Sequence, residues 1–408
     1  MYRKILLVTI CVVIMIFIGR FKYYGFLIEN LNKILGVFII QMHPSTSTIT
    51  LPVGISFYGF KILSYVIDVY RGNKPEVHFG KYALFIAFFP EIASGPIDRG
   101  ERLLPQFSKN HIFDYGKITY GLKLVAWGLF KKIVIADTLA YCVDTVYNSY
   151  SSYEGFVLIL TSFFYTIQIY CDFSGYSDMA IGLAKMLDID LCQNFRSPYL
   201  SASIKEFWRR WHISLSMWMR DYVYIPLGGN RKGKIRSYIN LLVTFLFSGL
   251  WHGAGWTFLL WGGVHGLAQI IEDMGRSLHI CKKNKWVNAL RIVGVFAFCN
   301  FAWIFFRSET LEQALYFFRC MVVGIEHPIA FIVNGFQNLP CVRIILWKIA
   351  FLVLILFVFD VVNKDIDIIL WISKKNKIVR WAIYCTFAFL IIVFLPVEPG
   401  RNFVYFQF

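Results

Sequence analysis

Apolar stretches of about twenty residues, each enough for one membrane-spanning helix, recur along this whole chain. Of its 408 residues, 57% are hydrophobic and only 16% are charged, whereas soluble domains carry roughly 25% charged residues. This apolar content also excludes a disordered or nucleic-acid-binding chain. The sequence therefore predicts an all-α polytopic membrane protein with roughly 8–11 membrane segments, re-entrant pieces included.

The apolar stretches follow one another without a low-complexity linker or a solenoid-type repeat. Residues 26–40 alternate apolar and polar at helical spacing, so they could lie in the membrane interface rather than cross it. We expect residues 1–397 to form one membrane domain and residues 398–408 to form a separate tail. The clearest stretches are 5–19, 51–70, 81–96, 118–143, 154–187, 238–271, 287–306, 343–362 and 381–397.

Basic residues orient the second half of the chain. The net charge is +16, and much of the excess gathers in the segments 205–236, 276–291 and 364–380. Placing all three segments in the cytoplasm satisfies the positive-inside rule. The last apolar stretch then runs outward, and the C-terminus is expected outside the cytoplasm.

The stretch 238–271 is too short for the two crossings that its flanks require. Both flanks are expected in the cytoplasm, so the chain must enter and return within 34 residues, whereas two full spans need about 40 residues and a turn. We expect two short half-helices or a re-entrant hairpin. Irregular backbone at membrane depth is tolerated only inside protein or beside a water-filled cavity, so His252, in the glycine-rich middle, is expected at a cavity floor.

His252 is therefore the leading catalytic candidate. An ionisable residue at membrane depth is a functional hypothesis by default, and imidazole can take and return a proton near neutral pH, as acyl transfer to a hydroxyl requires. The alternative is a histidine that is only hydrogen-bonded between helices. For His265, further along the same stretch, a packing or orienting role is favoured.

A second histidine, His212, follows a dense aromatic and basic segment that contains Trp208, Arg209 and Arg210. Such a segment is typical of an interface belt, which anchors a helix at the lipid headgroups. The alternative is that these side chains, and Trp251 beside the first histidine, bind or orient a charged donor.

Two acids, Asp172 and Asp178, lie inside an apolar stretch. Buried carboxylates must be paired or face water, so structural pairing is expected, and holding a histidine or arginine is the alternative.

The basic loop 227–234 is either an ordinary turn or a site that attracts a phosphorylated donor. The nine cysteines form no C-x-x-C pair, so we expect no metal site, no disulfide framework and no permanently bound cofactor.

The chain ends on the aromatic run 403–408 (FVYFQF). This run is either an interfacial anchor or a tail that folds back into a cavity. The segment 398–408 can extend at most about 36 Å, enough to reach from the outer surface to mid-membrane.

Taken in order, several motifs resemble the membrane-bound O-acyltransferase (MBOAT) family. Within it they are most similar to the branch of the alginate and peptidoglycan O-acetylation membrane proteins. The motifs are 21–24 (FKYY), 51–57 (LPVGISF), 89–97 (FPEIASGPI), 168–178 (QIYCDFSGYSD), 207–229 and 249–254 (GLWHGA).

The resemblance implies a ring of tilted helices around a thin centre, with a funnel toward the outside. It implies that His252 is the catalytic histidine and His212 a second active-site histidine. The C-terminal Phe-x-Tyr-Phe-x-Phe pattern is similar to that of the small partner protein in teichoic acid D-alanylation, which implies that Tyr405 carries the acyl group.

The resemblance further implies an O-acyltransferase of the bacterial inner membrane. It would move acetyl from a cytoplasmic thioester donor, acetyl-CoA, through His252 and Tyr405 to O-acetylate a cell-wall or exported polysaccharide. Membrane lipid and an extracytoplasmic SGNH-type acetyltransferase are the expected partners, and no nucleic acid. Further hydrophobic segments usually precede the 21–24 motif in this family, so the N-terminal part of the ring is expected to be short.

Three alternatives remain at this point. The segment 94–99 (SGPIDR) leans toward D-alanyl transfer to teichoic acid, whereas 225–231 (IPLGGNR) leans toward the acetyl branch. A transporter or flippase would also have broken helices at mid-membrane. A scaffold that only docks a secreted transferase would tolerate the loss of His252.

The predicted orientation can be tested with topology reporters fused after Phe408. Because the basic loops hold the preceding segment in the cytoplasm, we expect alkaline phosphatase to be active there and β-galactosidase to be inactive. Fusions within the loop 227–234 serve as the control and should give the opposite pattern. A C-terminal reporter that works only in the cytoplasm would refute the orientation.

Overall fold

The structure is a computed structural model that describes residues 2–36, 52, 54–277, 284–340, 343–364, 366–394 and 403. Helices and turns account for the structure of these described residues, and no strand occurs among them. Four helical stretches in this part of the chain are long and apolar enough to cross a membrane: Tyr2–Leu35, Phe156–Met186, Lys285–Arg307 and Leu346–Asn363. The predicted all-α membrane class is confirmed.

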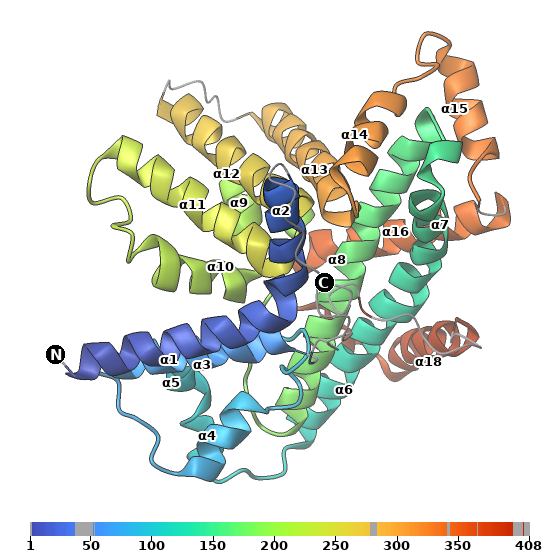
Figure 1. The fold of residues 1–408 in the computed structure, drawn as a ribbon. Coiled ribbons are helices and arrows are strands. Elements are labelled where there is room, and N and C mark those ends of the chain that lie inside the picture. The colour runs from blue at the N-terminus through green and yellow to red at the C-terminus, as the bar shows by residue number, and fades with distance from the viewer. Residues whose placement is uncertain are drawn as a thin grey trace.

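The longest helix, α8 (Phe156–Met186), runs through the middle of the molecule, with other helices on several sides (Figure 1). Because neighbours cover it all round, its sequence lacks the polar stripe of a surface helix. Beside it runs α6 (Tyr115–Leu129), which continues through the wide π-helical turn η4 (Phe130–Ala136) into α7 (Asp137–Asn148).

Glycines allow α6 and α8 to approach each other closely. A Cβ atom added at Gly121 would lie 2.5 Å from the carbonyl oxygen of Gly182, and one added at Gly128 would lie 2.5 Å from the carbonyl oxygen of Gly175. Small residues at a helix interface permit such backbone contact in membrane proteins. The two glycines of each helix are about two helical turns apart, so they recur on one face.

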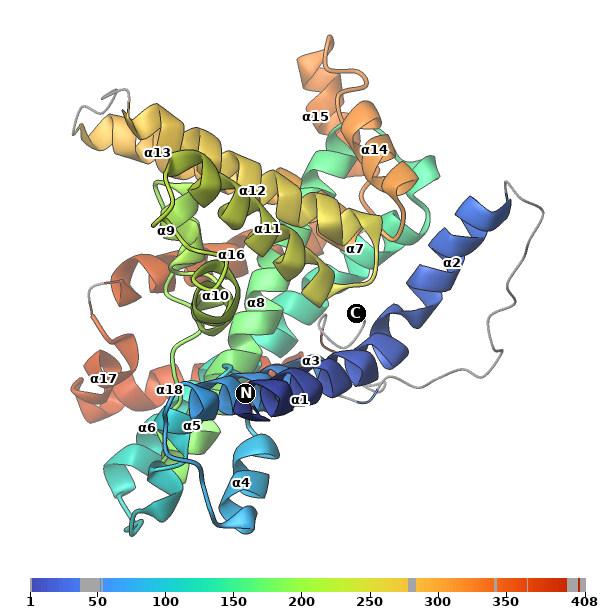
Figure 2. The same ribbon diagram turned by 60° about the vertical axis from the view of Figure 1, so that its left-hand side comes forward.

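The stretch 238–271 folds as a helical hairpin. Its arms are α11 (Lys234–His252) and α12 (Trp256–Ser277), which lie side by side in both views (Figures 1 and 2). At the end away from the turn, the Tyr238 hydroxyl donates to the Asp273 carboxylate at 3.2 Å. The hairpin expectation is confirmed, but the arms are longer than half-helices because both continue into the polar flanks.

The N-terminal segment is one long helical stretch with a π-helical turn inside it. It consists of α1 (Tyr2–Ile18), η1 (Gly19–Tyr23) and α2 (Tyr24–Leu35). The first part lies beside α3 (Ile55–Tyr70) (Figure 2). That the region 26–40 lies in the membrane interface stays a prediction.

The apolar stretch 81–96 is helical only in its first part. Only α4 (Phe79–Ile86) is helical there. Pro90 removes a backbone donor and disfavours helical backbone in the residue before it. The buried Glu91 then pairs with the buried Lys61 of α3 at 2.7 Å, which holds the irregular segment against that helix.

The other helices complete the fold around these elements. The stretches 287–306 and 343–362 form helices as predicted, α13 (Lys285–Arg307) and α16 (Arg343–Asn363). Helix α18 (Lys377–Val393) begins within the basic loop before the last apolar stretch. The remaining elements are α5 (Gly100–Leu103), η3 (Gln106–Ser108), η5 (Tyr150–Ser152), η6 (Pro198–Leu200), α9 (Ile204–Trp208), α10 (Ile213–Met219), η7 (Arg220–Tyr224), α14 (Leu311–Cys320), α15 (Pro328–Gln337) and α17 (Ile368–Ser373).

The glycine contact between α6 and α8 can be tested by alanine substitution. Glycine to alanine inside a helix ordinarily stabilises it by about 1 kcal/mol. Gly128→Ala should instead lower the unfolding temperature in detergent, because the new methyl group meets the backbone of α8. Gly294→Ala is the matched control, since it lies on α13 with open space around it. Equal stabilisation by both substitutions would contradict the proposed contact.

Candidate active site

His252 is the last residue of α11, where the hairpin turns. Its side chain is buried, with 4% of the residue exposed. The imidazole is enclosed by aromatic rings, with centroids 4.9 Å away in Trp251, 5.1 Å in Trp261 and 5.3 Å in Phe306. The aromatic rings therefore shield the imidazole from bulk solvent.

His212 lies beside His252, although forty residues separate them in the sequence. The two ring centroids are 6.2 Å apart, and His212 is fully buried. The residue precedes α10 with φ 44°, the left-handed region that non-glycine residues seldom adopt. Such local strain persists where the surrounding structure determines the conformation, and it is frequent at functional sites.

Asn194 fixes the protonation pattern of His212. Its Oδ1 atom lies 3.1 Å from Nδ1 of His212 and 3.3 Å from the backbone N–H of Ser214. Because that N–H can only donate, the contacted Asn194 atom must be the oxygen, and Nδ1 of neutral His212 must carry its proton. The lone pair is thus left on Nε2. Sequence reasoning missed Asn194, which follows α8 in irregular chain without a distinguishing motif.

His265 is joined to the site through tryptophans. The indole N–H of Trp208 donates to Nδ1 of His265 at 3.3 Å, so the ring proton of neutral His265 is on Nε2. Trp261 lies between the two histidines, 5.2 Å from His265 and 5.1 Å from His252 by ring centroids. The packing or orienting role of His265 stays a prediction.

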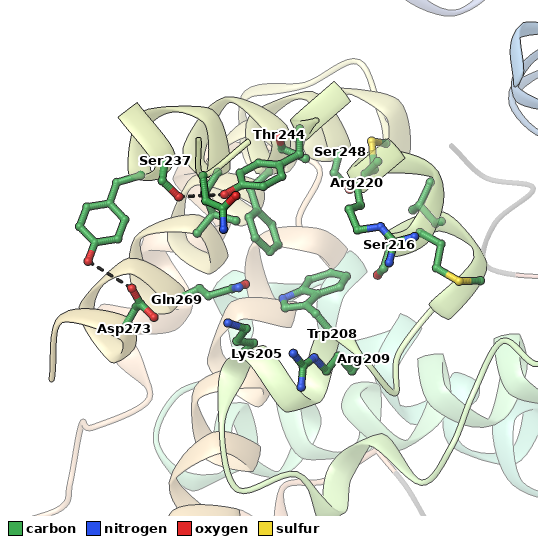
Figure 3. Close-up of a pocket in the computed structure, with 18 of the residues that line it drawn as sticks. Lys205, Trp208, Arg209, Ser216, Arg220, Ser237, Thr244, Ser248, Gln269 and Asp273 are labelled. Atoms are coloured by element: carbon green, nitrogen blue, oxygen red, sulfur yellow. Dashed lines mark hydrogen bonds between the residues drawn. The ribbon is translucent and has the colours of Figure 1, made fainter. Parts of the chain in front are cut away.

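A cavity of about 520 Å³ opens between α9, α10, α11 and α12 (Figure 3). Trp208 forms part of its wall, and Ser248 contributes from α11. Since Ser248 is four residues before His252, the cavity reaches within one helical turn of the buried histidines. Its lining also includes Lys205, Arg209, Ile213, Leu215, Ser216, Met217, Met219, Arg220, Tyr224, Asn230, Ser237, Tyr238, Leu241, Thr244, Phe245, Gln269, Glu272 and Asp273.

Two cations of this cavity, Lys205 and Arg209, are available for a ligand, whereas its acids serve the fold. Glu272 accepts the backbone N–H of Ile204 at 2.6 Å, and Asp273 accepts the Tyr238 hydroxyl. Lys205 and Arg209 have no ion-pair partner within the described residues. The cavity can therefore attract an anionic group.

Arg210 and Arg220 are engaged in ion pairs. Arg210 pairs with Glu206 at 2.7 Å, one helical turn earlier. Arg220 and Arg99 both donate to Asp221. Burial raises the pKa of Asp221, but the hydrogen bonds from Arg220 and Arg99 outweigh it and bring this pKa below its usual value. The carboxylate therefore remains charged at neutral pH and holds Arg220 at the cavity wall.

The two acids of α8 pair with consecutive lysines of η4. Lys132 donates to Asp172 at 2.6 Å, and Lys131 lies 2.7 Å from Asp178. These contacts agree with the structural pairing expected for both acids, and they join α8 to η4.

The proposed acyl carrier, Tyr405, lies outside the described residues. Phe403, two residues earlier, is described: its ring lies 4.5 Å from the Lys132 ammonium and 4.9 Å from the Tyr176 ring. Tyr176 is three residues from Phe173 on α8, and Phe173 contacts His212 with ring centroids 4.7 Å apart. Phe403 therefore lies against the face of α8 that reaches His212.

The fold and the site together define a multi-pass, helical membrane protein with a buried histidine pair at the end of a helical hairpin. A family model, described as MBOAT, membrane-bound O-acyltransferase family, matches residues 55–307. The chain belongs to this family.

Curated relatives support the match. The chain is 44% identical over 306 residues to the probable alginate O-acetylase AlgI of Azotobacter vinelandii, covering 74% of this chain and 60% of the relative. It is 37% identical over 350 residues to the peptidoglycan O-acetyltransferase of Helicobacter pylori, covering 79% and 65%. It is 29% identical over 289 residues to the teichoic acid D-alanyltransferase of Bacillus subtilis, covering 66% and 72%. The chain thus spans about three fifths of the alginate relative's length.

The contribution of Asn194 can be measured as protein stability. Asn194→Ala should lower the free energy of unfolding by about 1–3 kcal/mol, because buried N–H groups of His212 and Ser214 lose their acceptor. Ser177→Ala is the control, since it removes only the 3.3 Å contact at the amide nitrogen of Asn194. Denaturant unfolding in detergent gives both values. Equal losses in the two variants would contradict the assignment.

Proposed function

We propose that this chain transfers an acetyl group from a cytoplasmic thioester, acetyl-CoA, to the outer side of the membrane for O-acetylation of a polysaccharide. The observation that carries the proposal is the buried pair of His252 and His212, 6.2 Å apart, one helical turn from a cavity with available cations. Acyl transfer to a hydroxyl requires a base, and imidazole is the side chain suited to that role.

The cavity supplies a place for the donor. Coenzyme A carries phosphates, which Lys205 and Arg209 can attract. With the phosphates at these residues, the thioester arm would extend past Ser248 toward the histidines. Trp208, in the cavity wall, would line the path of the arm.

The proposed transfer has two steps, and in each step the proton of the attacking hydroxyl ends on the leaving group. His252 takes the proton of the Tyr405 phenol as its oxygen attacks the thioester carbonyl. The carbon–sulfur bond breaks, and the proton passes to the departing thiolate. An acceptor hydroxyl then attacks the aryl ester and releases the phenol. Ordinary thiols have a pKa near 8.5 and phenols near 10, whereas alcohols are far more basic, so each step moves acetyl to a poorer leaving group.

The position of Phe403 supports a tail that folds back toward the histidines. Consecutive Cα atoms are about 3.8 Å apart, so the Cα of Tyr405 lies within roughly 8 Å of the Cα of Phe403. Phe403 itself lies against Tyr176, on the α8 face that reaches His212.

The acceptor class follows from the relatives. Two of the similar relatives are a probable alginate O-acetylase and a peptidoglycan O-acetyltransferase. We infer that the polymer here is an exported polysaccharide or peptidoglycan, and that an extracytoplasmic SGNH-type acetyltransferase collects acetyl from Tyr405. In this arrangement the chain is an inner-membrane protein with its C-terminus outside the cytoplasm.

Two substitutions test the relay. His252→Ala and Tyr405→Phe should each reduce ester-linked acetate on the polymer at least about a hundredfold, as expected for loss of a general base or of the acyl carrier. Acetate is measured on separately purified wall and exopolysaccharide fractions, and membrane levels of the protein by immunoblot. Tyr141→Phe is the matched control, since this tyrosine is exposed on α7. Full acetylation by Tyr405→Phe would refute the relay.

Labelling with different acyl donors distinguishes acetyl transfer from the alternative functions. Purified protein incubated with labelled acetyl-CoA should form an acyl-protein whose label maps to the C-terminal peptide. A transporter or scaffold would form no acyl-protein. Labelling only from a D-alanyl thioester would assign the chain to the D-alanyl branch instead.

A further inference from the structure

The C-terminal end of α11 is buried, so its last carbonyl groups need partners other than water. The final four carbonyls of a helix have no intrahelical donor, and in apolar surroundings each unsatisfied group is costly. In α11 these groups belong to residues 249–252. The first of them, Gly249, accepts the backbone N–H of Gly253 at 3.3 Å.

The N-terminal segment satisfies the other three. The Tyr23 hydroxyl donates to the carbonyl of Leu250 at 2.6 Å. The Lys22 ammonium donates to the carbonyl of Trp251 at 2.5 Å and to that of His252 at 3.1 Å. All four terminal carbonyls of α11 therefore have a donor.

The Lys22 ammonium also joins a third element. It lies 3.3 Å from the hydroxyl of Ser56, near the start of α3. A cation at a helix C-terminus is favoured by the helix dipole as well as by the hydrogen bonds. One side chain thus connects η1, α3 and α11 at the residue that carries the imidazole.

A local irregularity accompanies this double contact. Adjacent residues of an ordinary α-helix point about 100° apart, yet Lys22 and Tyr23 both reach α11. They lie in η1, where the chain makes a π-helical turn (Gly19–Tyr23). Such turns occur frequently at functional sites.

The geometry points to Lys22 and Tyr23 as positioning residues for His252. They hold the carbonyls of the last turn of α11, and so they set the direction in which the imidazole leaves the helix toward His212. The adjoining turn contains Gly253 and Gly255, whose backbone freedom would otherwise leave this end loosely defined. The inference rests on the proposed catalytic role of His252. Both residues belong to the 21–24 motif described above and precede the region 55–307 that the family model matches.

Turnover of labelled acetyl-CoA by the purified full chain tests the inference. Lys22→Met should lower kcat about 10–100-fold, the loss that a displacement near 1 Å can produce. The donor KM should stay within about twofold, because Lys22 is not part of the cavity. Lys22→Arg, which keeps charge and donors, should recover much of kcat, and added methylammonium should partly restore Lys22→Ala. Tyr23→Phe should lose less, since it removes one hydrogen bond.

Lys33→Met is the matched control, because this lysine is exposed on α2 and pairs only with Glu29 at 2.8 Å within the described residues. A second readout does not depend on turnover: modification of His252 by diethylpyrocarbonate, quantified on its peptide by mass spectrometry. The rate should rise several-fold in Lys22→Met and stay unchanged in Lys33→Met.

Wild-type kcat and wild-type modification in both Lys22→Met and Tyr23→Phe would overturn the inference. It would equally be overturned if Lys22→Arg and added amine restored nothing, because the role would then be general packing. If Lys22→Met does not reach the membrane, Tyr23→Phe decides by the same two readouts. Full turnover in His252→Ala would defeat the proposed function instead, and the modification rates would still report on the positioning.

Discussion

The end of α11 inside the protein is the constraint on which the site depends. A helix that stops among apolar side chains leaves carbonyl groups that water cannot reach. The chain resolves this by bringing its N-terminal segment to the hairpin turn, where Lys22 and Tyr23 act as donors. The same contact places the imidazole of His252 next to His212. The contacts that provide donors for the terminal carbonyls of α11 are therefore the same contacts that position His252 in the site.

Buried ion pairs then connect the helices around this arrangement. Lys132 pairs with Asp172 between η4 and α8, and Lys61 pairs with Glu91 between α3 and an irregular segment. Buried pairs add little net stability, but removing one partner costs about 3–5 kcal/mol. Their effect is to fix the register between helices. For α8 this matters directly, because Phe173, next to Asp172, contacts His212.

Hydropathy predicted most helices and the hairpin, because an apolar stretch that forms a buried or membrane-spanning helix can be recognised from consecutive residues alone. It also indicated His252, through the short length of 238–271. The anchoring residues could not be predicted in this way, since the contact from Lys22 to Trp251 joins residues 229 positions apart. Net charge alone also does not locate every cation: Lys22 lies outside the basic segments 205–236, 276–291 and 364–380 and is held at the end of α11.

The histidine pair lies between two different surfaces, and this position suits a relay. On one side, Ile213 and Ser248 belong to the cavity wall. Ile213 directly follows His212, and Ser248 lies one helical turn before His252. On the other, Phe173 brings His212 to the α8 face where Phe403 lies. Aromatic rings fill the space around His252, and excluding water protects a thioester or aryl ester from hydrolysis. In the proposed relay, a donor on the first surface and a carrier on the second would meet at an imidazole that aromatic rings shield from solvent.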